Sequence, residues 1–407
     1  MLFSSISFIY YFLPIALIGS IYIPKRFKNI ALILASCIFY AWNGISSLFI
    51  FLSLLILSYI EACWLVKYKK PTLFTSFCLI HIFLMIYFKS TMNILGISFF
   101  TLQILSYMID LYQDTIQHTS LVHYLTYMTF FGHVLQGPIV RYQEIQNELT
   151  SRTPDIFQGI ERFVLGLSKK VLLADVLYGL CQSFETTNEA SMIYMWLYLI
   201  AYILRLYYDF SGYSDMAIGL GKMFGFHLPE NFQSPLTSRT LQDFWRRWHM
   251  SLGRWFKDYI YIPLGGNRNR WIRNLGIVWF LTSLWHGLSL PYLFWGLWMW
   301  IGLILEKKLK IKNRFYTWFI LLISFVFFSS PDVSIAWARF SILIGIQVPL
   351  LTQETISMFL TYGPVIFLAL FGIRKWKLPN WIYLPLFILC TAFMIHSSYM
   401  PFLYFQF

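Results

Sequence analysis

The stretch NLGIVWFLTSLWHGLSLPYLFWGLWMWIGLIL (274–305) contains no Asp, Glu, Lys or Arg in 32 residues. It exceeds the about 20 apolar residues that a helix needs to cross a bilayer. Gly287 and Pro291 weaken a helix, so the stretch is predicted to form two segments. Its one histidine, His286, is costly to place within a bilayer and is therefore a candidate functional residue.

Helical geometry predicts the immediate surroundings of His286. Thr282 and Ser289 stand four residues before it and three after it, which places both hydroxyls on its face of a helix. A histidine flanked by hydroxyls beside a broken helix indicates a polar, hydrated spot within the membrane. The alternative is a structural histidine, or an interfacial anchor beside Trp285.

The composition extends this interpretation to the whole chain. Of its 407 residues, 58% are hydrophobic and 12% are charged, whereas soluble domains carry about 25% charged residues. We expect an all-α polytopic membrane protein, a single domain over 1–407, with about nine to twelve crossings. The net charge of +13 comes mostly from short basic loops such as 25–28 and 307–314. Such loops remain cytoplasmic and contact the lipid bilayer, and they do not indicate nucleic-acid binding.

The mid-section 208–273 is too polar for ordinary spans and too aromatic for a solvated loop, which predicts helices that line a tunnel or lie at the interface. Within it, DFWRRWHMSLGRWFKD (243–258) is predicted to form one amphipathic helix, capped by Asp243. His249 falls on the apolar side with Trp245, and Arg246 falls on the opposite side. The alternative for His249 is a core histidine bonded to a neighbouring carbonyl.

Several further residues near membrane depth are candidates for the site. Asp209 and Asp215 could orient a histidine or pair with an arginine, although a helix cap or a buried ion pair is equally natural. Arg141 follows Gly137 and Pro138, which indicates a turn with an anchoring arginine. The scattered cysteines and the remaining histidines have no ligand spacing, so no metal site is expected.

Five blocks together resemble the membrane-bound O-acyltransferase family, specifically its bacterial alginate O-acetylation branch. They read LQGPIVRY (135–142), KKVLLAD (169–175), YDFSGYSDMAIGLGKMFGFHLPENF (208–232), LQDFWRRWHMSLGRWFKDYIYIPLGGNR (241–268) and LTSLWHGLSLPYLFWGLW (281–298). FSSISF (3–8) and PFLYFQF (401–407) also resemble the ends of the branch. The resemblance covers nearly the whole chain, and its long ordered blocks are specific.

The resemblance implies a fold, a reaction and a localisation. The family fold is a ring of tilted transmembrane helices around a central tunnel, in the cytoplasmic (inner) membrane. Acetyl groups from a cytoplasmic donor, with acetyl-CoA the natural candidate, pass through it to an extracytoplasmic polysaccharide, with no tightly bound cofactor. A separate periplasmic or extracellular transferase, such as an SGNH-type protein, is the expected partner. The acceptor is alginate-like, peptidoglycan or another surface glycan.

The resemblance also assigns roles to residues. His286 matches the family's catalytic histidine, and His249 matches its second functional histidine. A neutral imidazole suits the base that activates a hydroxyl, because its pKa near 6.5 lies close to the working pH. Candidate residues for donor binding or the tunnel are Arg246, Asn231, Trp245, Trp285, Asp209 and Arg141.

Three other functions remain open at this point. Proteins that transfer D-alanine to teichoic acid share the architecture. A transporter of an anionic or lipid-linked solute would also explain intramembrane histidines and a basic mid-section, although the chain has no internal repeat. A scaffold that only recruits a soluble transferase is the third alternative.

Overall fold

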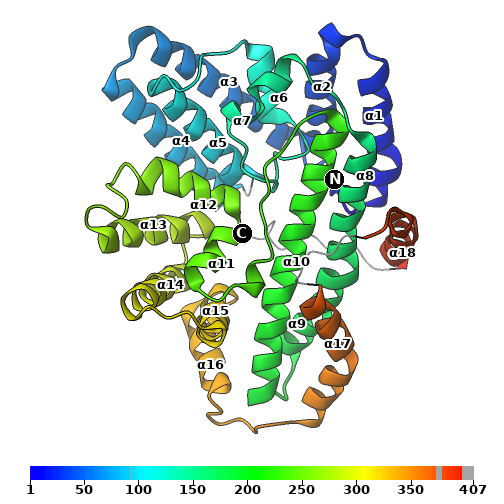
Figure 1. Ribbon diagram of the computed structural model, residues 1–407, viewed down its shortest axis with the longest axis vertical. Helices are drawn as coiled ribbons and strands as arrows, with labels where there is room; N and C mark the ends of the chain where they lie inside the picture. Colours follow the sequence, from blue (N-terminus) through cyan, green and yellow to red (C-terminus); the bar gives the residue numbers. More distant parts are fainter. Residues whose placement is uncertain (93, 373–377, 397–407) are drawn as a thin grey trace. The chain divides into compact units, whose positions relative to one another are not determined.

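The computed structural model describes residues 1–92, 94–372 and 378–396, so PFLYFQF (401–407) lies outside the described residues. The described chain forms helices and no strands, as the hydropathy predicted. Its contacts divide it into two compact units, and the long helix α10 (Met192–Phe224) contributes to both. Figure 1 shows the course of the helices along the chain.

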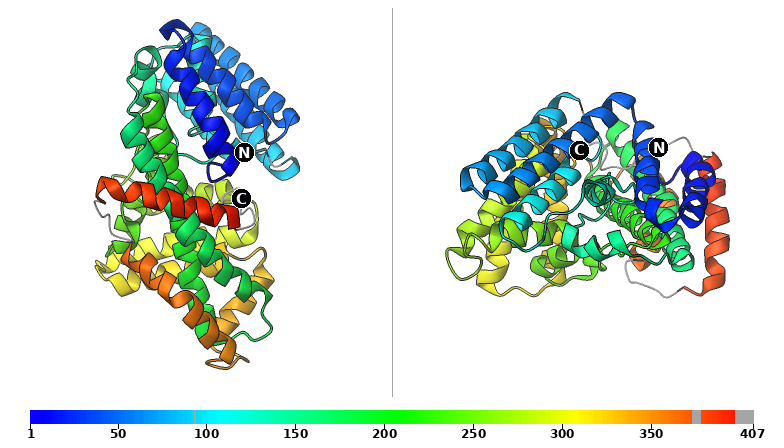
Figure 2. Two further views of the ribbon diagram at one scale, coloured as in Figure 1. Left: turned by 90° about the vertical axis from the view of Figure 1, so that its right-hand side faces the viewer. Right: turned by 90° about the horizontal axis from the view of Figure 1, so that it is seen from above.

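The first unit contains the N-terminal helices, the end of α10 and the last helix. Tyr10, in the π-helical turn Phe8–Phe12, shares a hydroxyl hydrogen bond of 2.8 Å with Thr391 of the last helix, which brings both ends of the described chain together in this unit (Figure 2). Its helices are α1 (Leu13–Tyr22), α2 (Lys28–Ala41), α3 (Ile45–Tyr68), α4 (Pro71–Thr91), α5 (Ile97–Tyr112), α6 (Leu121–Thr129), α7 (Tyr142–Thr150), α8 (Ile156–Ser168) and α18 (Tyr383–His396).

The second unit begins at Ser168 and contains the first part of α10 and the chain from Asn231 to Ile382. Its helices pack in the order of the chain, with α13 on α14 and α14 on α15 (Figure 1). They are α9 (Asp175–Thr186), α11 (Leu241–Arg247), α12 (Met250–Phe256), the π-helical turn η5 (Lys257–Tyr261), α13 (Trp271–His286), α14 (Leu290–Leu309), α15 (Arg314–Phe328), α16 (Val333–Leu343) and α17 (Gln353–Phe371).

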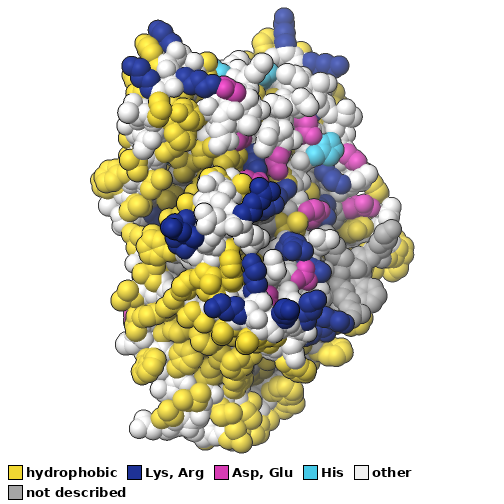
Figure 3. Space-filling model, turned by 60° about the vertical axis from the view of Figure 1, so that its left-hand side comes forward, with side chains coloured by type: hydrophobic (Ala, Val, Ile, Leu, Met, Phe, Trp, Pro, Cys, Tyr) yellow, Lys and Arg dark blue, Asp and Glu magenta, His cyan; other side chains and the backbone are white. Residues whose placement is uncertain are grey.

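Among the described residues, three helices are long and apolar enough to cross a bilayer, namely α3, α4 and α17. Five shorter apolar segments accompany them, and hydrophobic side chains cover much of the face in Figure 3. The sequence predicted about nine to twelve crossings, more than these helices provide. The difference arises because several apolar runs form short or interrupted helices; the run 160–182, for example, contains the π-helical turn Lys169–Ala174.

The charge-free stretch 274–305 forms two helices, as predicted. Helix α13 ends at His286, and α14 begins at Leu290 with Pro291 in its first turn. Because the helix ends at His286, the predicted helical pairing of His286 with Ser289 is wrong: Ser289 precedes α14 as its N-cap residue.

The predicted single helix over 243–258 is wrong. Two helices, α11 and α12, are interrupted at Trp248 and His249, and His249 adopts φ 44° and ψ 54° in the left-handed region. Asp243 is not the cap, because the hydroxyl of Thr240 accepts the backbone N–H of Asp243. The division into apolar and charged sides holds, since Trp248 and His249 are buried and Arg246 is exposed.

The far end of α14 supports the start of α11. The carboxylate of Glu306 accepts the backbone N–H groups of Leu241 and Gln242, the latter at 3.0 Å. These N–H groups open a helix and have no partner within it, and a carboxylate at a helix N-terminus is favoured by the helix dipole. The position of α11 is therefore tied to α14.

Candidate functional site

A cavity of about 1010 Å³ lies within the second unit, and both His249 and His286 line it. Its walls come from the α11–α12 region, the loop after η5, α13, α14 and α15. The two histidines are 3% and 6% exposed. Two residues that are distant in sequence and were predicted as a functional pair therefore share one enclosed space.

His249 is held by a polar network centred on Asn231, which is fully buried. The side-chain oxygen of Asn231 accepts the backbone N–H and the hydroxyl of Ser251 at 3.2 and 2.9 Å, and it lies 3.2 Å from Nδ1 of His249. The backbone oxygen of Asn231 accepts the N–H of Met250 at 2.9 Å. Asn231 thus fixes both the ring of His249 and the chain that follows it.

This network defines the tautomer of His249. Because the Asn231 atom is an oxygen that accepts other donors, Nδ1 of His249 carries the proton and Nε2 is the accepting nitrogen. Burial lowers the pKa of His249 to about 3, and the residue lies outside the three candidate spans. The imidazole is therefore neutral at physiological pH.

His286 is surrounded by aromatic rings. The ring centroids of Trp295 and Phe328 both lie 5.2 Å from that of His286, and Tyr292 lies at 6.3 Å. Thr282 lines the same cavity, as its helical spacing predicted, although its hydroxyl donates to the Val278 carbonyl at 2.7 Å. Packing more than polar contact therefore surrounds this ring.

The indole of Trp285 contacts both histidines. Its ring centroid lies 6.0 Å from that of His249 and 4.9 Å from that of His286, in edge-to-face arrangements. Trp245 lines the cavity and packs edge-on against Trp279 and Trp295. Both tryptophans that the sequence nominated therefore belong to the walls around the two imidazoles.

One part of the cavity wall is basic. Arg246 lines it together with Arg254, Lys257 and Arg268, and no Asp or Glu is among its lining residues. A one-signed set of cations on a cavity of low polarity attracts anionic ligands. The sequence nominated Arg246 alone; the other three stand in the resembling block 241–268 but were not singled out, because spacing alone did not show that they face one cavity.

The predicted candidates Asp209 and Arg141 are not among the lining residues. Asp209 accepts a hydrogen bond from Lys170 at 2.6 Å, and Lys170 also pairs with Asp175 at 2.6 Å. The backbone N–H of Arg141 donates to the carboxylate of Glu144 at 2.8 Å at the start of α7, in the first unit. Their observed contacts are structural ones.

Asp215 realises one of its predicted alternatives in the first unit. Its carboxylate accepts Nε of Arg162 at 2.8 Å, and Arg162 also contacts Glu230 at 2.7 Å. It is a buried ion pair with an arginine, as one predicted alternative had it.

Comparison with known proteins places this geometry in a family. Residues 31–327 match the membrane-bound O-acyltransferase family. The chain is 33% identical to a probable alginate O-acetylase AlgI of Pseudomonas aeruginosa over 84% of this chain and 74% of the relative. It is 32% identical to a peptidoglycan O-acetyltransferase of Helicobacter pylori over 77% and 72%. A teichoic acid D-alanyltransferase of Bacillus subtilis is 27% identical over 56% and 62%.

The match extends over most of the chain, and two relatives exceed 30% identity with most of this chain aligned. The resembling blocks that carry His249 and His286 both fall inside the matched range. The protein belongs to the membrane-bound O-acyltransferase family and is a membrane-bound O-acyltransferase.

Proposed function

We propose that the enzyme transfers an acetyl group from a cytoplasmic thioester, acetyl-CoA, to hydroxyl groups of an extracytoplasmic cell-envelope polysaccharide. It would act in the cytoplasmic membrane with a separate transferase that places the acetyl group on the glycan. The observation that carries the proposal is the single cavity lined by both His249 and His286. The names of the most similar relatives support an acetyl group and a polysaccharide or peptidoglycan acceptor.

The basic wall supports a donor that carries phosphates. Arg246, Arg254, Lys257 and Arg268 would attract the phosphate groups of the donor, because guanidinium groups bind phosphate through two parallel hydrogen bonds. The remaining wall is largely aromatic and aliphatic, which suits the uncharged thioester arm. The wall therefore matches a long donor with an anionic head.

His286 would act as the general base. Its imidazole removes the proton from the acceptor hydroxyl, whose oxygen attacks the thioester carbonyl. The C–S bond then breaks, and the proton passes from the imidazolium to the leaving thiolate, so that atoms and charges balance. A positioned general base accelerates a step about 10²- to 10⁴-fold.

His249 would position the reacting groups. With Nδ1 donating toward Asn231, its Nε2 accepts a hydrogen bond and cannot polarise a carbonyl while the ring is neutral. Accepting a proton or the hydrogen bond of an acceptor hydroxyl suits this nitrogen. Of the two roles that sequence reasoning allowed, relay is therefore favoured over polarisation of the donor.

The test is acyl transfer in proteoliposomes. Labelled acetyl-CoA is supplied on the side of the basic loops with a glycan acceptor and its transferase, and the wild type is compared with His286→Ala. His227→Gln is the matched control, because His227 is an exposed histidine of the first unit. Loss of transfer in His286→Ala alone supports the enzyme. Unchanged transfer indicates a scaffold, uptake of intact donor indicates a transporter, and transfer of D-alanine in place of acetyl indicates the teichoic-acid reaction.

A further inference from the structure

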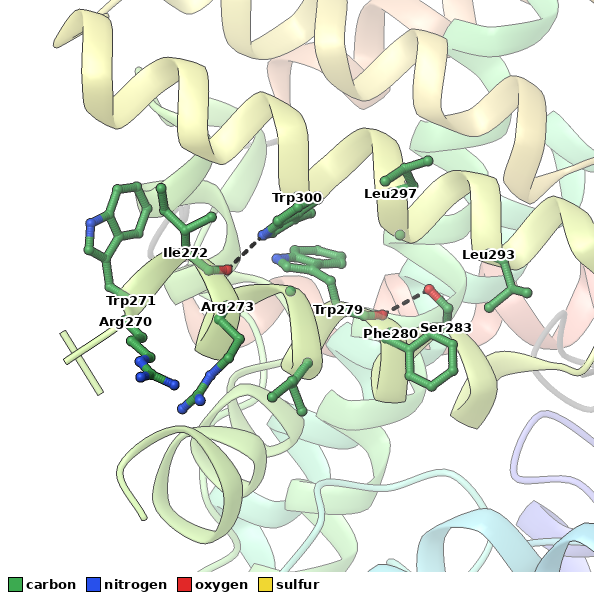
Figure 4. A pocket seen from close by; sticks show the side chains of 13 residues that line it. Arg270, Trp271, Ile272, Arg273, Trp279, Phe280, Ser283, Leu293, Leu297 and Trp300 are labelled. Carbon is green, nitrogen blue, oxygen red and sulfur yellow. Dashed lines mark hydrogen bonds between the residues drawn. The ribbon is translucent and has the colours of Figure 1, made fainter. Parts of the chain in front are cut away.

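A second hollow lies between α13 and α14, on the side of α13 that carries Arg273 and Phe280 (Figure 4). Its volume is about 930 Å³, and most of its lining side chains are apolar. In Figure 4, Arg270 and Arg273 lie at one end, and Phe280 and Leu293 lie toward the other. We call this hollow the α13–α14 groove.

Hydrogen bonds and close packing fix the walls of the groove. The indole N–H of Trp300 donates to the carbonyl of Ile272 at 2.9 Å, and the hydroxyl of Ser283 donates to the carbonyl of Trp279 at 2.8 Å. Gly296 allows the helices to approach, because a Cβ there would lie 1.9 Å from the Ser283 hydroxyl. The groove is therefore a formed feature of the helix pair.

The charge at one end of the groove is uniformly positive. Arg270 and Arg273 are exposed, and no acidic residue is among the lining residues. Lys307 of α14 adds a third cation, since its ammonium lies 3.9 Å from the ring centroid of Trp271 at the same end. Arg273 donates to the side-chain oxygen of Asn274 at 3.0 Å, which leaves its charge unneutralised by that contact.

We propose that the α13–α14 groove binds an anionic phospholipid. Arg270 and Arg273 hold the phosphate of the headgroup, and an acyl chain lies along Trp279, Phe280 and Leu297 toward Leu293. Basic pockets between membrane helices bind anionic headgroups, and apolar length beside the charge suits a lipid better than a soluble anion. The proposal goes beyond the acyl-transfer function and does not depend on it.

The orientation of the groove agrees with this occupant. The charged end lies at the start of α13 and near the end of α14, where the basic segment 307–314 also begins. Positive loops face the cytoplasm, so the groove opens at the cytoplasmic leaflet, which carries the anionic lipids. Helix α13 connects the groove to the cavity, because Trp279 lines both and His286 ends the same helix. A bound lipid would therefore steady the helix that carries His286.

Native mass spectrometry of the full-length protein, released from detergent with equimolar phosphatidylglycerol and phosphatidylcholine, tests the proposal. The wild type is expected to retain phosphatidylglycerol preferentially, and the double variant Arg270→Gln, Arg273→Gln is expected to lose about tenfold or more of that preference. The matched control is Lys308→Gln, Lys312→Gln, which removes the same charge from exposed positions outside the groove lining. Equal loss in the control would overturn the proposal in favour of general charge attraction.

A second variant separates the groove from its charge. Leu297→Trp adds volume to an exposed wall residue of the groove and is expected to lower lipid retention several-fold with both arginines intact. Excess inorganic phosphate added to the wild type is expected to displace little phosphatidylglycerol, since it offers no acyl chain. Unchanged retention in Leu297→Trp, or full displacement by phosphate, refutes the lipid assignment. These readouts measure binding, so they stand whether or not the acetyl-transfer proposal holds.

Discussion

His249 and His286 both stand where a helix is interrupted, but different contacts hold their rings. His249 has a left-handed backbone conformation, and the side chain of Asn231 bonds both its ring and Ser251. His286 ends α13 and is packed among Trp295, Phe328 and Trp285. One ring is oriented by hydrogen bonds and the other by aromatic packing.

This difference separates two demands on a transferase site. Hydrogen bonding fixes the tautomer and protonation state of a histidine, whereas packing against rings fixes its position and leaves its nitrogens available for a substrate. Under the proposed function, His249 is therefore the ring whose proton is assigned in advance. His286 is the ring suited to exchange a proton during the reaction.

The largest expected effect is at the packed ring. His286→Ala removes the proposed base and should lower the transfer rate about 10²- to 10⁴-fold, measured as label on the glycan in proteoliposomes. Folding is checked by the elution profile and thermal unfolding in detergent. Transfer within about tenfold of the wild type would assign the base to another residue and remove the contrast between the two histidines.

The next effect separates the ring of His249 from its backbone. His249→Asn and His249→Val both remove the imidazole and should reduce transfer about 100-fold. Only valine disfavours the left-handed conformation, so His249→Val should be less stable than His249→Asn by about 1–3 kcal/mol. Equal unfolding free energies would show that the left-handed turn is not retained, and active His249→Asn would dispense with the ring.

Changing the partner of His249 should move the pH profile. Burial keeps the pKa of His249 at about 3, so neutral His249 persists in the wild type far below pH 6. Asn231→Asp places a carboxylate beside Nδ1 and raises that pKa, so the ring becomes charged at a higher pH. The acidic limb of transfer should shift toward alkaline pH, with about tenfold loss at the old plateau if the shift exceeds one unit. An unchanged profile would mean that Asn231 acts on the backbone only.

The smallest effect concerns the contact that joins the two regions. Glu306→Gln keeps one accepting oxygen for the N–H groups that open α11 and should lower the unfolding free energy by about 1 kcal/mol. Glu189→Gln is the control, because Glu189 is an exposed carboxylate of the same unit. If Glu306→Gln leaves both stability and transfer unchanged, the two helix breaks are independent of this contact.

Periodicity and composition predicted much of this molecule. The charge-free stretch 274–305 forms two helices around His286, and the apolar side of 243–258 is buried. These features depend on residues close in sequence, whose spacing determines their face. The pairing of His249 with His286 on one cavity was expected from the resemblance, and the structure places both rings there.

The interruption at His249 could not be predicted from local signals. Neither glycine nor proline stands there, and the bonds that hold the turn come from Asn231, 18 residues earlier. Asp209 shows the same limit, because its partner Lys170 stands 39 residues earlier. Hydrogen bonds between distant segments depend on the tertiary arrangement, which residue spacing does not encode.

Helix α14 has a mechanical consequence for both histidines. It starts three residues beyond His286, and Glu306 near its other end grips the first turn of α11, the helix that leads to His249. A 20-residue helix is a stiff rod of roughly 30 Å. Any substrate that pushes one imidazole aside must therefore also strain the other's support, so entry of donor and acceptor is felt jointly at both rings.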